Sequence, residues 1–446
     1  MNLSKYSLIT CCFLFNTMAS SANTETAADR RLTSVSTLKN GIPLIIRETP
    51  GSDIVHIELS YTTGTSSLSP DRRALNLLAF ETMPYATKKY SKEKVFALTE
   101  KYSFGVECKG GVEVSHCQVE TVKDFLPQAL DLLLSVVTEP IFNAEDVDLS
   151  KKQRVADFQQ EAQNPETQVN AVVNTVFYDA SHPYRLLPED GIKQTLPLTV
   201  EDLRGYHRTT LDASTMYLIY AGPKIDKTTI TKLNEGLGKI GKTNRTPQPI
   251  PPPAFDPKNS FAFEHRAIPT AYIRMKFNAP SATSPDAAAA EVMFQILSEK
   301  LHEEVRTKRS LSYAIHAGTI QYKEGIGMIA ASTSKPRETI ETIAAVVRDF
   351  RDKGVSQENL NEYRNIFTTG YYLTMETHDQ LANALSSSQA YFGDATRLYD
   401  LPARLNAVTP ADIQRVAKET LKNIRVGVVY DKDKFKNEWV QPIKAL

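Results

Sequence analysis

Two side chains that can donate hydrogen bonds, the guanidinium of Arg306 and the phenol of Tyr313, lie seven residues apart in this chain. A permanent cation beside a phenol can hold carbonyl or carboxylate oxygens, provided that the fold brings the two groups together. There is also a purely structural interpretation, in which Arg306 offsets the dipole at a helix C-terminus and Tyr313 is a core-facing strand residue. Local pattern alone leaves both interpretations open.

The elements expected to position this pair are a helix followed by a strand. From Ser284 to Thr307 apolar residues recur at helical spacing, with Ser284 as a candidate N-cap and Pro285 at the first helical position. After Arg309 the spacing changes to a period of two, which predicts a strand with one face formed by Leu311, Tyr313 and Ile315. The pair would then converge from a helix end and a strand.

The run LHEEVRTKRSLSYAIHA, followed by GIGMIAASTSKP, resembles the second signature of the pitrilysin/insulinase-type zinc peptidases. Half-length members of that family include the subunits of mitochondrial processing peptidase. The resemblance implies that Arg306 and Tyr313 hold the substrate backbone near the scissile bond, where such donors can also stabilise an oxyanion.

The resemblance also locates a zinc site, and this chain departs from the family pattern there. Active members carry an inverted H-x-x-E-H motif, whose two histidines bind zinc from one helix face. The matching positions here are Leu78, Glu81 and Thr82, so only the glutamate remains. A third ligand would fall among Asp157, Phe158 and Glu161, with Phe158 the best match. We therefore expect no metal and no catalytic residue in this chain.

Histidines elsewhere in the sequence do not rebuild the site. A tetrahedral catalytic zinc needs three protein ligands, and one or two carboxylates cannot replace two imidazoles. None of the eight histidines has ligand spacing, and each is interpreted as a surface or structural residue: His56, His116, His182, His207, His265, His302, His316 and His378. Glu81 is interpreted as a relic or as a partner in a salt bridge.

The half that should carry zinc has lost its ligands, whereas the other half keeps Arg306 and Tyr313. This contrast predicts a non-catalytic, substrate-binding subunit of a heterodimeric zinc endopeptidase, with the zinc expected in a homologous partner subunit and an extended peptide as substrate. In the family, the zinc of one half-length chain faces the Arg/Tyr element of the other. The alternative is an inactive scaffold or peptide-binding protein without an enzymatic partner. A third hypothesis is an active peptidase with an unrecognised metal site.

An internal repeat predicts the domain organisation. HIELSYTTGTSSLSPDRRALNLLAFETM, which starts at His56, aligns without a gap on AYIRMKFNAPSATSPDAAAAEVMFQILS, which starts at Ala271, at an offset of 215. Residues 241–260 contain six prolines without periodicity and are expected to be a linker. We predict an α+β fold of two duplicated, sandwich-like halves, residues 33–240 and 261–446, each an antiparallel or mixed sheet with helices on one face.

Composition and the N-terminus bear on the compartment. Lys+Arg and Asp+Glu are equal at 52 each, so charge gives no indication of a nucleic-acid or anionic-membrane partner. Residues 1–22 contain one early lysine, an apolar run and small residues up to Ala22, which predicts a cleaved signal peptide and a periplasmic or secreted protein. No later stretch is apolar enough to predict a membrane span.

Two cysteines remain after removal of such a leader. Cys108 and Cys117 flank the sequence KGGVEVSH, which has the pattern of a hairpin and would place them opposite each other. In an oxidising compartment we expect either a disulfide or two buried thiols at these positions.

Overall fold

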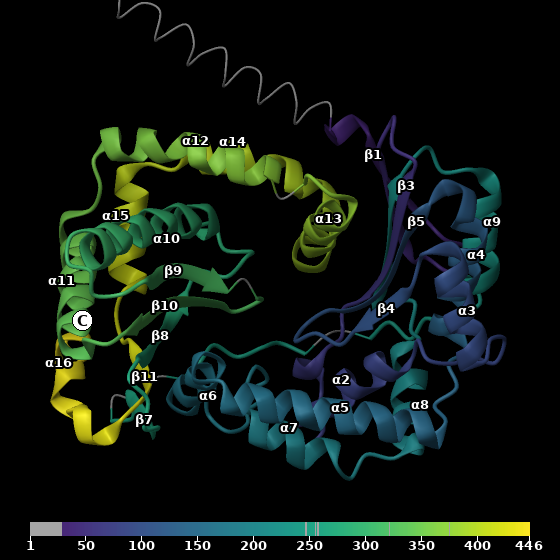
Figure 1. The fold of residues 1–446 in the computed structure, drawn as a ribbon. Coiled ribbons are helices and arrows are strands. Elements are labelled where there is room, and N and C mark those ends of the chain that lie inside the picture. Colours follow the sequence, from purple (N-terminus) through teal and green to yellow (C-terminus); the bar gives the residue numbers. More distant parts are fainter. Residues whose placement is uncertain (1–28, 246–247, 255, 257, 321, 374) are drawn as a thin grey trace, which may run out of the picture.

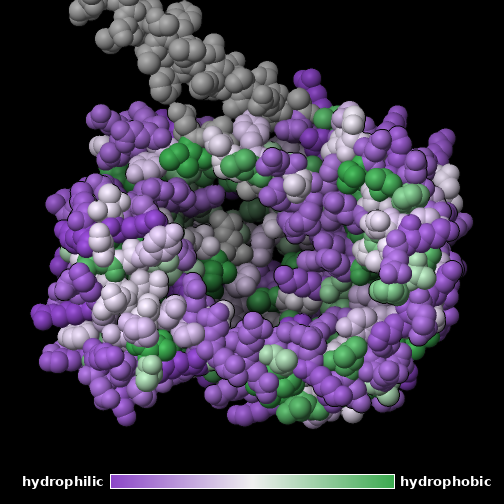
Figure 2. Space-filling model, in the orientation of Figure 1, coloured by the Kyte–Doolittle hydropathy of each residue, from purple (hydrophilic) through white to green (hydrophobic). Residues whose placement is uncertain are grey.

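The computed structural model describes residues 29–245, 248–254, 256, 258–320, 322–373 and 375–446. It contains two sheets with helices around them, arranged as two halves about a central hollow (Figures 1 and 2). The predicted α+β fold is confirmed. The expected signal peptide, residues 1–22, lies outside the described residues.

The first sheet has six strands in the order β1-β2-β6-β3-β5-β4. Its β2/β6 pair is parallel and the remaining pairs are antiparallel. The strands are β1 (Thr33–Thr37), β2 (Pro43–Glu48), β3 (Ile54–Tyr61), β4 (Val106–Lys109), β5 (Ser115–Val122) and β6 (Met216–Gly222). The helices of this half are α2 (Ala74–Thr82), α3 (Lys92–Tyr102), α4 (Leu126–Thr138), α5 (Ala144–Gln163), α6 (Pro165–Phe177), α7 (Pro188–Thr195), α8 (Val200–Thr210) and α9 (Lys227–Leu237).

The second sheet has five strands in the order β7-β11-β8-β10-β9. It repeats the pattern of the first, with a parallel β7/β11 pair and antiparallel neighbours. The strands are β7 (Phe261–His265), β8 (Ala271–Ala279), β9 (Ala314–Ile320), β10 (Gly325–Thr333) and β11 (Arg425–Tyr430). The helices are α10 (Ala287–Leu301), the π-helix η3 (His302–Thr307), α11 (Pro336–Lys353), α12 (Gln357–Leu373), α13 (His378–Phe392), α14 (Leu401–Ala407), α15 (Pro410–Thr420) and α16 (Gln441–Lys444).

Each half packs its own helices on one face of its sheet and lends a helix to the other half. Helix α13 lies against the opposite face of the first sheet, where Leu381 and Leu385 join a buried cluster with Ile45, Tyr217 and Ile219 (Figure 1). Helix α6 lies against the second sheet in the corresponding way. This exchange holds the two halves together by apolar burial.

The repeat needs one correction. The gapless alignment places the core residues Ile57 and Leu59 of β3 opposite Tyr272 and Arg274 of β8, whereas the core of the second half contains Ile273 and its neighbours at every second position. A shift of one residue moves a strand's side chains to the other face, so the strands need an offset of 214 or 216. The offset of 215 does match most buried positions of the helices, since Leu75, Leu78 and Thr82 of α2 align with the buried residues 290, 293 and 297 of α10.

Within the described residues, none of the helices combines the length and the apolar character that a bilayer crossing requires.

Candidate functional site

The segment from His302 to Ala314 is built by an unusual helix end. Helix α10 runs into the π-helix η3, in which the Lys308 amide donates to the Glu303 carbonyl at 2.9 Å. Ser310 then adopts a left-handed conformation, with φ of 49°, and the Leu311 amide turns back to the Val305 carbonyl. The reversal directs the chain back past the helix it has just left.

Arg306 and Tyr313 come together at this reversal. The Arg306 Cζ atom lies 4.4 Å from the centre of the Tyr313 ring, within range of a cation–π interaction. On its other side, the Arg306 Nη1 atom is 3.2 Å from the Nε2 atom of His302. We call these three residues, His302, Arg306 and Tyr313, the clamp.

Two expectations about the local structure are wrong. The helix has Asp286 rather than Ser284 at its N-cap, because the Ser284 side chain instead accepts from the Asp286 amide in a preceding turn. Tyr313 precedes β9 and is 81% exposed, so it is not core-facing. The turn at Ser310 changes the direction of the chain before the strand. Ser312 is then buried, with its hydroxyl donating to the Ser332 carbonyl at 2.7 Å, so the side chains of residues 311–313 do not alternate between core and solvent as expected.

Neighbouring charges leave Arg306 without an acidic partner. Lys308 forms ion pairs with Glu303 at 2.8 Å and with Glu304 at 2.7 Å, and Arg309 also pairs with Glu304. No carboxylate of the described residues forms an ion pair with Arg306. Of the three cations in this short segment, Arg306 is the one whose charge remains available to a ligand.

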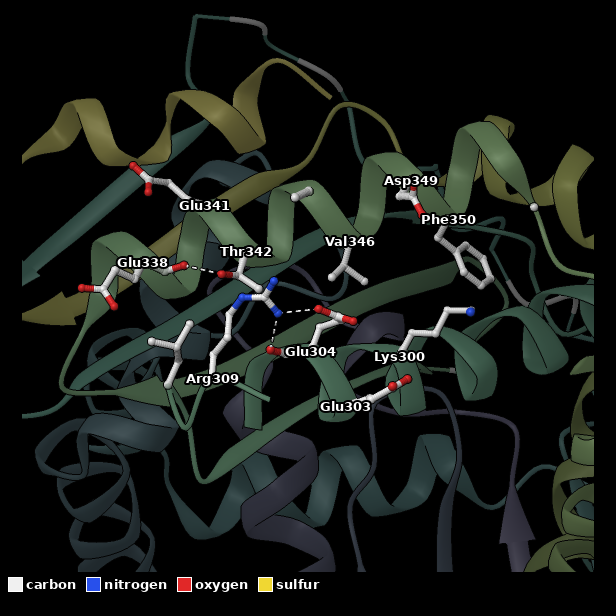
Figure 3. Close-up of a pocket in the computed structure, with 13 residues that line it drawn as sticks. Lys300, Glu303, Glu304, Arg309, Glu338, Glu341, Thr342, Val346, Asp349 and Phe350 are labelled. Atoms are coloured by element: carbon white, nitrogen blue, oxygen red, sulfur yellow. Dashed lines mark hydrogen bonds and ion pairs between the residues drawn. The ribbon is translucent and has the colours of Figure 1, made fainter. Parts of the chain in front are cut away.

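A groove lies along η3 and the following turn, between them and helix α11 (Figure 3). Its volume is about 900 Å³; Glu303, Glu304 and Arg309 line one wall, and Val346 and Phe350 lie on the facing helix α11. The residues of the clamp are not among those that line it.

The positions matched to the zinc motif are packed as ordinary helix residues. Leu78 is fully buried, and Thr82 is 1% exposed with its hydroxyl donating to the Leu78 carbonyl at 2.7 Å. Neither side chain offers a nitrogen or a carboxylate to a metal, so the residues present do not fit a zinc ion. Among the described residues, no group of three or more His, Cys, Asp or Glu side chains is placed to hold a metal.

Glu81, the remaining residue of the motif, is bound by a cation from α5. The Arg154 guanidinium donates to its Oε2 atom from Nε at 3.0 Å and from Nη2 at 2.5 Å. Burial raises the pKa of the Glu81 carboxyl above its ordinary value, and Arg154 partly opposes this shift. Arg154 also lies over the ring of Phe158, the best match for the third ligand. Of the other two candidates, Asp157 is 3.7 Å from Arg154 in an ion pair and Glu161 is exposed.

A cavity of about 580 Å³ lies beside Glu81. The β4–β5 hairpin forms part of its wall, and Cys108 pairs directly with Cys117 across this hairpin. The structure joins the two cysteines in a disulfide with a Cα–Cα distance of 4.0 Å.

Sequence reasoning missed two residues of these sites. His302 was interpreted as a surface or structural histidine, although its spacing of four residues from Arg306 on a helical segment could have indicated the contact. Arg154 lies four residues before Phe158 on the helix expected to carry the third ligand, and that spacing was the available signal.

Comparisons with known proteins agree with the two-half fold. The profile of the insulinase family, peptidase family M16, matches residues 74–186, and the profile of the peptidase M16 inactive domain matches residues 197–367. An uncharacterized zinc protease of Streptomyces coelicolor is 22% identical over 66% of this chain and 67% of its own length. A non-peptidase homolog of Helicobacter pylori, YmxG, is 18% identical over 86% and 88%.

Solved structures show the same architecture. A peptidase M16 inactive domain from Pseudomonas fluorescens superposes with a TM-score of 0.82 at 18% identity and covers 90% of this chain and 98% of its own. The periplasmic protease PqqL of Escherichia coli has a TM-score of 0.76 at 17% identity over 90% of this chain, which spans about half of that protease (45%). By its two matched profiles, which cover residues 74–186 and 197–367, the chain belongs to peptidase family M16, as a homologue whose zinc motif is degenerate.

Proposed function

We propose that this chain is the non-catalytic, substrate-binding subunit of a heterodimeric zinc endopeptidase. One contrast carries the proposal: Arg306 lies over an exposed tyrosine without an acidic partner, whereas Leu78 and Thr82 stand where zinc ligands would be. The clamp is ready to bind a ligand, and the remnant of the metal site is not.

The clamp suits the backbone of an extended peptide. A guanidinium carries five N–H donors, and the Arg306 donors that do not face His302 can bind peptide carbonyl oxygens. The exposed Tyr313 offers an aromatic face and a hydroxyl at the same place. The donors of Arg306 and Tyr313, brought together by the chain reversal, would fix the position of a peptide while the homologous partner subunit supplies the zinc site.

The compartment belongs to the same proposal. We place the mature protein in the periplasm or outside the cell, following the predicted leader at residues 1–22 and the similarity to a periplasmic protease.

A second candidate is an inactive scaffold or peptide-binding protein that works without an enzymatic partner. Its support is the similarity to a relative described as a non-peptidase homolog and the ion pair that binds Glu81 to Arg154. This function would use the same peptide-binding surface without proteolysis.

Purification of the tagged chain from the envelope fraction of its own host tests the choice. The proposal expects an equimolar partner of similar size that carries zinc, and a peptidase activity that neither chain shows alone. A chain that comes alone or as a self-pair, without metal and without activity, would contradict it and support the second candidate.

A further inference from the structure

The Arg306 guanidinium is held from two sides by groups of this chain. The Arg306 Cζ atom lies over the Tyr313 ring, 4.4 Å from its centre, and the Arg306 Nη1 atom is 3.2 Å from the Nε2 atom of His302. The tyrosine is 81% exposed and precedes β9, whereas His302 is half-buried in the first position of the π-helix. The histidine is therefore the firmer of the two supports.

The direction of the contact with His302 follows from the chemistry of the two groups. A guanidinium has N–H donors and no acceptor, so Arg306 Nη1 donates and the Nε2 atom of His302 accepts. The imidazole must then be neutral, with its own proton on Nδ1. A phenylalanine at this position would keep the ring shape and remove the acceptor.

From this geometry we propose that His302 is a positioning residue for substrate binding, which holds the Arg306 guanidinium over the Tyr313 ring with its remaining N–H groups toward the peptide. The inference rests on the proposed function, because it assumes that Arg306 binds the peptide. Its physical basis is preorganisation: an arginine already fixed in one orientation loses less conformational freedom when the ligand arrives.

The orientation of Arg306 can be measured without any ligand. Full-length protein is treated with phenylglyoxal, which modifies arginine, and the rate at Arg306 is followed by peptide mapping with mass spectrometry. We expect His302→Phe to raise this rate about fivefold, as the loss of one charge-assisted hydrogen bond predicts. We expect His302→Gln, whose side-chain carbonyl can accept from Arg306, to stay within about twofold of the unchanged protein. His265→Phe, on the distant strand β7, is the matched control.

Binding is then measured with fluorescein-labelled β-casein as an unstructured probe. His302→Phe should weaken binding about tenfold and His302→Gln should largely restore it. In the background of Arg306→Ala, the His302→Phe substitution should have no further effect, because its influence passes through the arginine. A purely structural role of His302 would weaken binding equally in both backgrounds.

The outcomes distinguish failure of the positioning role of His302 from failure of the proposed substrate-binding function. An unchanged phenylglyoxal rate at Arg306 in His302→Phe overturns the positioning role, whatever happens to binding. Weakened binding in Arg306→Ala together with normal binding in His302→Phe also overturns it and leaves the proposed function intact. If Arg306→Ala binds the probe normally, the proposed function is wrong. If His302→Phe does not fold, the same comparisons are made with His302→Ala.

Discussion

The two halves of this molecule pair their charged groups in opposite ways along corresponding helices, on α2 in the first half and just beyond α10 in the second. In the first half, the helix that follows the central strand carries Glu81, and Arg154 binds that carboxylate. In the second half, the corresponding helix runs into the segment with Arg306, and the two nearby carboxylates are occupied by Lys308 and Arg309. One charge has been neutralised from within the chain, and the other has been left free of acidic partners.

The difference shows how a duplicated fold divides its tasks. Both helices keep their buried apolar stripe, so the packing of the two halves is preserved. What differs is the pairing of a few charged groups at the helix ends. An internal ion pair satisfies a half-buried carboxylate and makes it a poor ligand, whereas an unpaired guanidinium beside an exposed ring remains a binding group.

The largest expected effect is on peptidase activity, when the guanidinium of Arg306, which has no acidic partner, is removed. In the proposed complex with a zinc-bearing partner, Arg306→Ala should lower kcat/KM by about 10–10³-fold, because the proposed role of this donor is to position the peptide or stabilise the oxyanion. Lys308→Ala is the matched control, since that lysine is already paired with Glu303 and Glu304, and it should change the rate less than about twofold. Peptidase rates within about twofold of each other for Arg306→Ala and the unchanged complex would remove Arg306 from this role.

The second prediction reverses the loss of the metal site. The triple substitution Leu78→His, Thr82→His and Phe158→Glu restores the ligand types of the family motif at the matching positions. We expect this variant to bind zinc about 10–100-fold more tightly when Arg154→Gln is added, because the guanidinium at Glu81 repels the cation and ties up the neighbouring carboxylate. Equilibrium dialysis against zinc measures both affinities, with Arg208→Gln as the control. Equal affinities with and without Arg154 would show that this ion pair does not close the site.

The third prediction compares the two hairpins that occupy equivalent sheet edges. The β4–β5 hairpin carries the Cys108–Cys117 disulfide, whereas the β9–β10 hairpin of the second half carries no cysteine. The double substitution Cys108→Ser and Cys117→Ser should cost the first hairpin about 2–3 kcal/mol, the loop-closure entropy of a short cross-linked loop. Hydrogen exchange should become faster in residues 106–122 and stay unchanged in residues 314–333. Alkylation of the unreduced protein gives a separate check, since two added alkyl groups would mean that the bond is absent.

Much of this architecture can be predicted from the sequence, because the features that determine it are local and periodic. The duplicated helix pattern indicates two halves, and Pro165 after Asn164 predicts the break between α5 and α6, where the Asn164 side chain caps the new helix. The absence of zinc ligands is likewise a matter of residue types. The gapless alignment was wrong in the strand, because the strands and the helices differ in offset by one residue. A shift of one residue places every side chain of a strand on the opposite face, and the match between the helices gives no sign of it.

The parts that could not be predicted depend on contacts between distant segments or on single backbone angles. The exposure of Tyr313 follows from the left-handed conformation of Ser310, a residue type that gives little warning of it. The pairing of Glu81 with Arg154 joins residues 73 positions apart. The exchange of α6 and α13 between the halves was not indicated by any motif or spacing in the sequence. It buries charged residues such as Glu58 and Lys276, which composition alone does not show.

The smallest prediction concerns one of these buried surfaces. Lys276 on β8 is 5% exposed beneath α6, where its ammonium bonds Asn174 Oδ1 at 2.7 Å. Burial lowers the pKa of Lys276 to about 7, with the nearby Arg274 acting in the same direction. Between about pH 7 and the ordinary pKa of lysine, the unfolded chain therefore binds more protons than the folded one, and the free energy of unfolding rises with pH. Below that window both states are protonated and the full cost of the buried charge is present.

Lys276→Met should remove this dependence, worth about 2–3 kcal/mol between pH 6 and pH 9, and should stabilise the protein more at pH 6 than at pH 9. Urea unfolding at the two pH values measures it, with Lys308→Met, an exposed and paired lysine, as the control. The first sheet presents Glu58 and Ser60 to α13 at the corresponding interface, where a carboxylate accepts from two hydroxyls. If Lys276→Met keeps the full pH dependence of the unchanged protein, the buried charge beneath α6 is not the cause of that dependence. The interfaces of α6 and α13 would then not differ in the electrostatic cost that this experiment measures.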